Sequence, residues 1–153
     1  MPDPTPAADP SLTALLDRLP HTGAARLPDR ILSLEPGRRI EAARHLRPDD
    51  PVLNQDGILP SALLVELMAQ AGGLLLLDEA SAEGSPPRGG LLAGLRRLHV
   101  HGAARAGETV FVRCELVRRI GDVALLTCEA ARGDGVRLAH GQLQLRLMAR
   151  QAP

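Results

Sequence analysis

One charged side chain stands alone in the most apolar stretch of the sequence. Between Ser61 and Leu77, Glu66 is the only charged residue. Burying a carboxylate in an apolar helix costs free energy unless it is paired or hydrogen-bonded, and burial favours its neutral form. A neutral carboxyl group in such surroundings can donate a proton near neutral pH. Glu66 is therefore expected to be either a general acid or a structural carboxylate satisfied by nearby backbone donors.

The five histidines are the other candidates for proton transfer. His99 and His101 occupy alternate positions of a predicted strand and so share one face. Two imidazoles could begin a metal site, but no third ligand is evident, so we predict solvent-exposed side chains and no metal. His45 and His140 are also expected at the surface, and His21 lies in a predicted loop.

Composition excludes several kinds of function. Aromatic residues make up 1% of the chain, with no Trp or Tyr, so an aromatic platform for nucleic-acid bases is not expected. The 18 basic and 18 acidic residues balance, which gives no net attraction to DNA or anionic membranes. Every basic residue apart from histidine is Arg, which excludes Schiff-base chemistry through lysine. Hydrophobic residues make up 44%, enough for an aliphatic core.

The chain is expected to form a single domain over residues 11–150, after a disordered tail at residues 1–10. The tail has no basic region followed by an apolar run, so we do not interpret it as a signal peptide. The apolar run at 61–77 is short for a membrane span and contains Glu66, which predicts a helix buried in a soluble fold. Cys114 and Cys128 lack metal-ligand spacing and are predicted to be reduced core residues of a cytoplasmic protein.

Hydrophobic periodicity predicts one long helix among many strands. The helix begins at Ser61 after Pro60 and ends near residues 78–83, and a short helix covers 12–19. Strands are expected over residues 31–34, 39–46, 91–100, 108–120, 123–131 and 136–148. Their alternation predicts inward faces that include Ile40, Ala42 and Arg44, then Val110, Val112, Cys114 and Leu116, and finally Ala139, Gly141, Leu143, Leu145 and Leu147.

This order predicts an α+β hot-dog fold, in which an antiparallel sheet wraps around one long central helix. Half of that helix would lie exposed in a lone subunit, so dimerisation is expected.

Three segments and the strands that follow them resemble the FabZ/FabA-type 3-hydroxyacyl-[acyl-carrier-protein] dehydratases, over about residues 19–149. The segments are LPHTGAARLPDRILSLEPGRRI (19–40), LPSALLVELMAQAGG (59–73) and LLAGLRRLHVHGAARAGETV (91–110). The resemblance implies a hot-dog lyase of fatty-acid, polyene or pigment biosynthesis that converts a carrier-bound 3-hydroxyacyl chain into a trans-2-enoyl thioester without a cofactor. It also implies that Glu66, six residues after Pro60, is the acid that helps the hydroxyl leave as water.

The chain departs from this family where the catalytic base should be. The family's loop histidine has no counterpart in PVLNQDGILP (51–60), and this shortened loop resembles the ApeP-like dehydratases of aryl-polyene clusters. His21 is the best replacement base, because it lies in a loop that the fold can bring towards the site. The related dehydratases also carry a histidine there beside their catalytic one, which favours a structural role for His21. Asp56 is next, and an ordinary Asp-Gly turn is the favoured interpretation of it. The helix start near Gly57 offers N–H groups to a thioester oxygen. The predicted substrate-binding residues are Asp56, Gly57, Ser61 and Gln70.

Two alternatives stay open. The chain could be a catalytically incomplete subunit that forms a heterodimer with a His-bearing dehydratase, because acid and base of one site come from different subunits in this fold. It could instead be an acyl thioesterase, since other hot-dog families hydrolyse thioesters with a helix carboxylate. The base, the acyl chain length, the pathway and the choice between homodimer and heterodimer are not fixed by the sequence.

Overall fold

A computed structural model describes residues 10–82 and 89–148. The predicted tail, apart from Pro10, lies outside the described residues. The helical elements are α1 (Pro10–Thr13), the 3-10 helices η1 (Ala14–Arg18) and η2 (Gly23–Ala25), and α2 (Ser61–Ala82). The strands are β1 (Arg30–Glu35), β2 (Arg39–His45), β3 (Gly89–Val100), β4 (Thr109–Ile120), β5 (Val123–Arg132) and β6 (Arg137–Met148).

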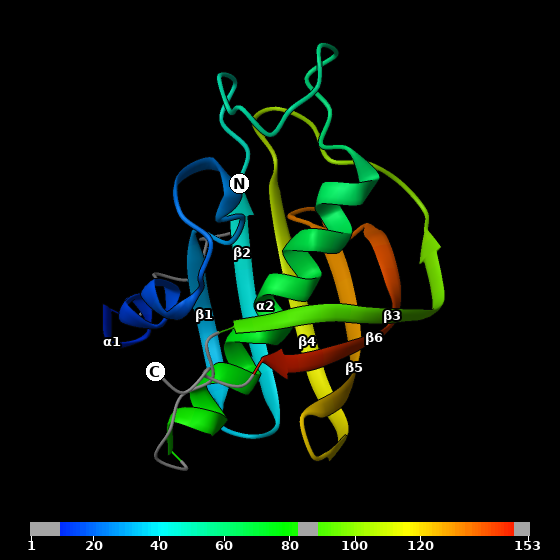
Figure 1. Ribbon diagram of the computed structural model, residues 1–153. Coiled ribbons are helices and arrows are strands. Elements are labelled where there is room, and N and C mark those ends of the chain that lie inside the picture. Colours follow the sequence, from blue (N-terminus) through cyan, green and yellow to red (C-terminus); the bar gives the residue numbers. More distant parts are fainter. Residues whose placement is uncertain (1–9, 83–88, 149–153) are drawn as a thin grey trace.

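The six strands form one antiparallel sheet in the order β1-β2-β4-β5-β6-β3. The sheet curls around α2, and β6 and β3 bend forward so that the start of β3 passes in front of the second half of the helix (Figure 1). This arrangement confirms the predicted hot-dog fold. It brings the beginning of β3, the end of β6 and the loop before β1 to the same side of α2.

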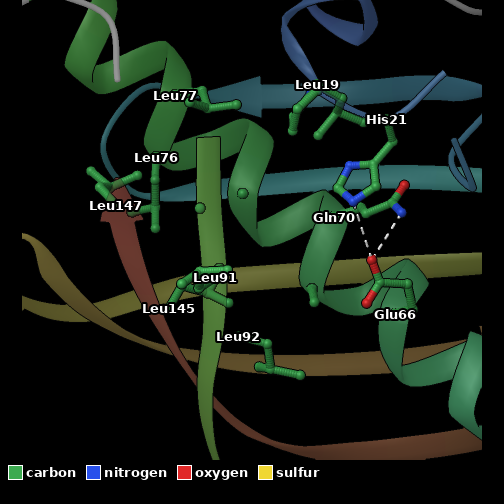
Figure 2. A pocket seen from close by; sticks show the side chains of 14 residues that line it. Leu19, His21, Glu66, Gln70, Leu76, Leu77, Leu91, Leu92, Leu145 and Leu147 are labelled. Carbon is green, nitrogen blue, oxygen red and sulfur yellow. Dashed lines mark hydrogen bonds and ion pairs between the residues drawn. The ribbon is translucent and has the colours of Figure 1, made fainter. Parts of the chain in front are cut away.

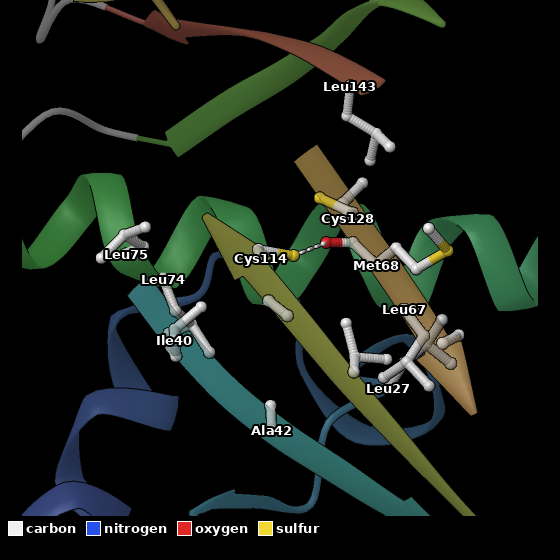
Figure 3. Close-up of a cluster of buried hydrophobic side chains, with 14 of the residues drawn as sticks. Leu27, Ile40, Ala42, Leu67, Met68, Leu74, Leu75, Cys114, Cys128 and Leu143 are labelled. Carbon is white, nitrogen blue, oxygen red and sulfur yellow. Dashed lines mark hydrogen bonds between the residues drawn. The ribbon is translucent and has the colours of Figure 1, made fainter. Parts of the chain in front are cut away.

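The core lies between α2 and the concave face of the sheet, and it is almost entirely aliphatic (Figure 3). The three predicted inward faces are confirmed, and the fully buried side chains include Ile40, Leu74 and Leu143. Cys114 and Cys128 lie opposite each other on β4 and β5, and both are buried and free. The Cys114 thiol donates to the carbonyl of Met68 at 3.4 Å, and burial raises its pKa.

The predicted helix at 12–19 is instead split into α1 and η1. Leu15, Leu16 and Leu19 are all buried, and the N–H of Leu19 donates to the carbonyl of Leu16, as in a 3-10 turn. A segment this short cannot sustain an α-helix by local hydrogen bonding, so packing of its leucines decides its geometry. The other predicted elements match the observed ones within a few residues, as expected at frayed ends.

The expectation that half of α2 would be exposed is wrong. Among the described residues, α2 is long and apolar enough to cross a membrane by length and composition, but 67% of Ser61–Asp78 is buried inside the fold, as in a core helix. Beyond the exposed first turn, the partly exposed positions include Glu66 and Gly73. Strand β3 is more exposed: among the described strands it pairs only with β6, and Leu91, Leu92, Leu95 and Val100 are exposed.

Candidate active site

A pocket with an aliphatic lining opens beside α2, where the loop before β1 faces the start of β3 and the end of β6 (Figure 2). Its volume is about 710 Å³, including the open mouth. The lining side chains from the loop and the two strands are Leu19, Pro20, His21, Leu91, Leu92, Leu145 and Leu147. An apolar cleft with few polar groups is the usual form of a small-molecule site.

Helix α2 supplies one continuous face of this pocket. Its lining residues are Glu66, Ala69, Gln70, Gly73, Leu76 and Leu77. These positions follow the three- and four-residue spacing of a helical stripe, so they lie one above another along the pocket. Glu66 lies at one end of the stripe, the two leucines lie at the other end, and Gln70 lies between them with two small residues.

Glu66 lies on the pocket wall next to an amide and an imidazole (Figure 2). Its Oε1 atom accepts a hydrogen bond from Gln70 Nε2 at 3.0 Å and lies 3.5 Å from His21 Nε2. The side chains of Glu66 and His21 are 39% and 33% exposed. The expectation of a buried carboxylate is therefore wrong, because the face of α2 that carries Glu66 borders the pocket instead of the core.

The buried Gln70 amide links Glu66 to the loop that carries His21. Its Oε1 atom accepts from the N–H of Leu27 at 2.8 Å, and Nε2 donates to the carbonyl of Ala25 at 2.9 Å as well as to Glu66. The loop contacts fix which way the amide points, so its donor side faces the carboxylate. Sequence reasoning assigned Gln70 only to substrate binding. The available signal for the link was its i, i+4 spacing from Glu66.

His21 reaches Glu66 with one ring nitrogen, and the other is sequestered. Nδ1 is buried and has no hydrogen-bond partner among the described residues, while Nε2 faces Glu66. Arg26 Nε donates to the backbone carbonyl of His21 at 3.1 Å, which holds the loop. A histidine base is usually oriented by a third group on its second nitrogen, and the described part of this chain supplies none.

Three predicted substrate-binding residues lie outside the pocket lining. Asp56 is exposed in a turn, and the N–H of Gly57, whose φ is +70°, donates to the carbonyl of Asn54. Gly57 therefore has no N–H left for a thioester oxygen. Ser61 is exposed at the start of α2, where the N–H groups of Leu63 and Leu64 donate to the carbonyl of Pro60. Substrate binding by Asp56, Gly57 and Ser61 stays a prediction.

The remaining histidines lie away from the pocket. The rings of His99 on β3, His101 just after β3 and His140 on β6 stack on one another, and His101 Nε2 lies 2.8 Å from His140 Nδ1. The described residues contain no group of three or more ligands that could hold a metal ion. His45 is exposed, as predicted, with Nδ1 3.1 Å from the Thr109 hydroxyl.

Comparison with known proteins identifies the family. The sequence pattern of the ApeP-like family, described as ApeP dehydratase, matches residues 13–149. The chain belongs to this family. It is also 31% identical over 106 residues to the 3-hydroxyacyl-[acyl-carrier-protein] dehydratase FabZ of Symbiobacterium thermophilum, covering 67% of this chain and 72% of that protein.

Solved structures support the same fold. The dehydratase heterocomplex ApeI:P from Xenorhabdus doucetiae contains a chain with a TM-score of 0.79 and 23% identity, over 88% of this chain and 91% of that one. A hypothetical thioesterase with coenzyme A from Streptococcus pneumoniae has a TM-score of 0.64 and 12% identity, over 80% and 90% of the two chains. Since both kinds of protein share the fold, the fold does not distinguish water elimination from thioester hydrolysis.

Proposed function

We propose that this protein eliminates water from a 3-hydroxyacyl thioester carried by an acyl carrier protein. The observation that carries the proposal is the Glu66 carboxylate, held by Gln70 and 3.5 Å from His21, at one end of an aliphatic pocket. The family and its FabZ relatives support the reaction class, and the leucines along α2 suit an acyl chain. A role in polyene or pigment biosynthesis is part of this proposal.

The chemistry needs a base at C2 and an acid at C3. In the proposed step, His21 Nε2 takes the C2 proton, its electron pair forms the C2–C3 double bond, and the C3–O bond breaks as protonated Glu66 gives its proton to the leaving hydroxyl. The products are water and a 2-enoyl thioester, with His21 protonated and Glu66 ionised. Proton return from His21 to Glu66 across their contact restores the starting state. Adjacent groups on one wall suit removal of H and OH from one face.

Part of the site is proposed to come from a second hot-dog subunit. Three observations favour this version. Residues 51–60 contain no histidine, and His21 Nδ1 lacks an orienting partner among the described residues. In addition, one edge of β3, which lies beside the pocket, has no partner among the strands that the structure describes. The ApeI:P structure is, by its description, a heterocomplex of dehydratases. In a heterodimer of this kind, the partner's histidine would act as base and Glu66 would remain the acid.

The test is to supply the purified protein with a 3-hydroxyacyl carrier protein and to follow loss of water by mass spectrometry. Turnover by the protein alone, abolished by Glu66→Gln and reduced by His21→Ala, supports the complete site. Turnover only after addition of a His-bearing homologue supports the shared site. Turnover that is unchanged in Glu66→Gln removes Glu66 from the mechanism, and release of free acid identifies a thioesterase instead.

A further inference from the structure

Arg44 and Asp50 form a buried ion pair behind the candidate site. Arg44 Nη2 donates to Asp50 Oδ1 at 2.7 Å and to Oδ2 at 2.8 Å, and Nε lies 3.2 Å from Oδ2. The two side chains are only 12% and 1% exposed. Asp50 comes from the irregular segment before α2, and Arg44 lies on the inward face of β2, as its alternation with Ile40 and Ala42 predicted.

The same guanidinium group also binds the backbone of the loop that carries His21. Arg44 Nη1 donates to the carbonyls of Arg26 and Leu27 at 3.1 and 3.0 Å. The N–H of Leu27 in turn donates to Gln70 Oε1. Leu27 is thus held from both sides, by Arg44 at its carbonyl and by Gln70 at its N–H.

These contacts form a continuous chain of hydrogen bonds that ends at the candidate acid. Asp50 orients Arg44, Arg44 fixes the backbone at Leu27, and that backbone fixes the direction of the Gln70 amide. Gln70 then donates to Glu66. Backbone carbonyls in a partly buried loop need donors, and here side chains supply them where no regular secondary structure does.

We propose that Arg44 and Asp50 are positioning residues for the reaction, which hold the His21 loop and the Gln70 amide so that Glu66 faces the substrate. The inference rests on the proposed function for its catalytic consequence but not for its structural one. Arg is suited to this task because its planar fork serves a carboxylate and two carbonyls at once. A lysine at this position would keep the charge but not the four acceptors in one geometry.

The matched control is the ion pair between Arg113 on β4 and Glu41 on β2. Arg113 donates to Glu41 Oε1 at 2.6 and 2.9 Å, but both side chains are more exposed and neither lines the pocket. Removing Arg44 alone would strand a buried carboxylate and can prevent folding. The informative variants are therefore Arg44→Lys and the double variant Arg44→Met with Asp50→Asn, compared with Arg113→Lys.

The first measurement needs no activity. The side-chain amide signals of Gln70, assigned through their loss in Gln70→Ala, are followed by nitrogen-edited NMR in the full chain. Both Arg44 variants are expected to shift or broaden these signals, whereas Arg113→Lys leaves them in place. Unchanged Gln70 signals in a folded Arg44 variant would overturn the positioning role, whether or not the protein is a dehydratase.

The second measurement uses the dehydration assay, with a His-bearing homologue present if the wild-type protein requires one. Because a misplaced catalytic group can cost about 10²-fold in rate, both Arg44 variants are expected to lower kcat by at least about tenfold with little change in KM. The loss should shrink in a Gln70→Ala background, since the effect passes through that amide. Arg44 variants with the same kcat as Arg113→Lys contradict the inference. So does a loss of kcat that stays equally large in the Gln70→Ala background.

Discussion

The two adjacent glycines of α2 are predicted to respond differently to the same substitution. A Cβ added to Gly72 would lie 3.2 Å from methyl carbons of Leu126 and Leu145, which are buried. A Cβ added to Gly73 meets nothing within 4 Å, because that side of the helix borders the pocket. Only Gly72 therefore has a close-packing role.

Each Gly→Ala change adds the same helix propensity, worth about 1 kcal/mol. Gly73→Ala should gain that amount and raise the thermal midpoint by about 2–4 °C, the shift per kcal/mol for a domain of this size. Gly72→Ala must also push apart two leucines, and overpacking of a core costs about 1–3 kcal/mol. Both variants gain the same helix propensity, so this gain does not contribute to the difference between them. Gly72→Ala should therefore be less stable than Gly73→Ala by the overpacking cost.

Thermal unfolding followed by circular dichroism, at matched protein concentration, checks this order of stability. A Gly72→Ala variant as stable as Gly73→Ala would refute the packing argument.

Gly73 also lies seven residues beyond Glu66, or about 10 Å at the rise of an α-helix. An acyl chain that runs along this face of α2 from Glu66 therefore reaches Gly73 about 10 Å past the reacting centre. Gly73→Leu should therefore slow turnover of substrates with longer acyl chains and spare those with shorter ones.

Three further predictions concern stability and the acid. Burial alone would raise the pKa of Asp50, but hydrogen bonds from Arg44 and Val52 bring that pKa below its usual value. The ionised carboxylate therefore stabilises the folded state above about pH 4. This stabilisation is lost as the pH falls through the pKa of Asp50 in the folded state. Urea midpoints should drop on acidification less steeply for Asp50→Asn than for the wild type. Gly141→Ala places a Cβ 2.8 Å from the Leu98 Cα atom, so backbone must move, and calorimetry should show a loss of about 1–3 kcal/mol. Glu66→Gln should lower kcat by about 10²-fold or more while its thermal midpoint stays near that of the wild type, since the side chain is half-exposed.

The sequence predicted the fold better than it predicted the site. Alternation and helical periodicity are local patterns, and they located the strands and α2. The surroundings of Glu66 depend on which face of α2 borders the pocket, and an evenly apolar helix does not reveal that face. The contacts of Leu27 with Gln70 and with Arg44 join segments that are distant in the sequence, so no local pattern could predict them. The placement of His21 was suggested by family resemblance and not by its own sequence context.

Strand β3 also bears on the order in which the protein can assemble. Its only partner among the described strands is β6, the last one made, and the register joins Leu92 to Leu145 across a long loop of chain. Pairings between distant segments form slowly because the loop between them must first close. During synthesis, α2 and its carboxylate therefore exist before the opposite wall of the pocket does. A nascent chain that stops before Arg137 has the candidate acid but no enclosed place for a substrate.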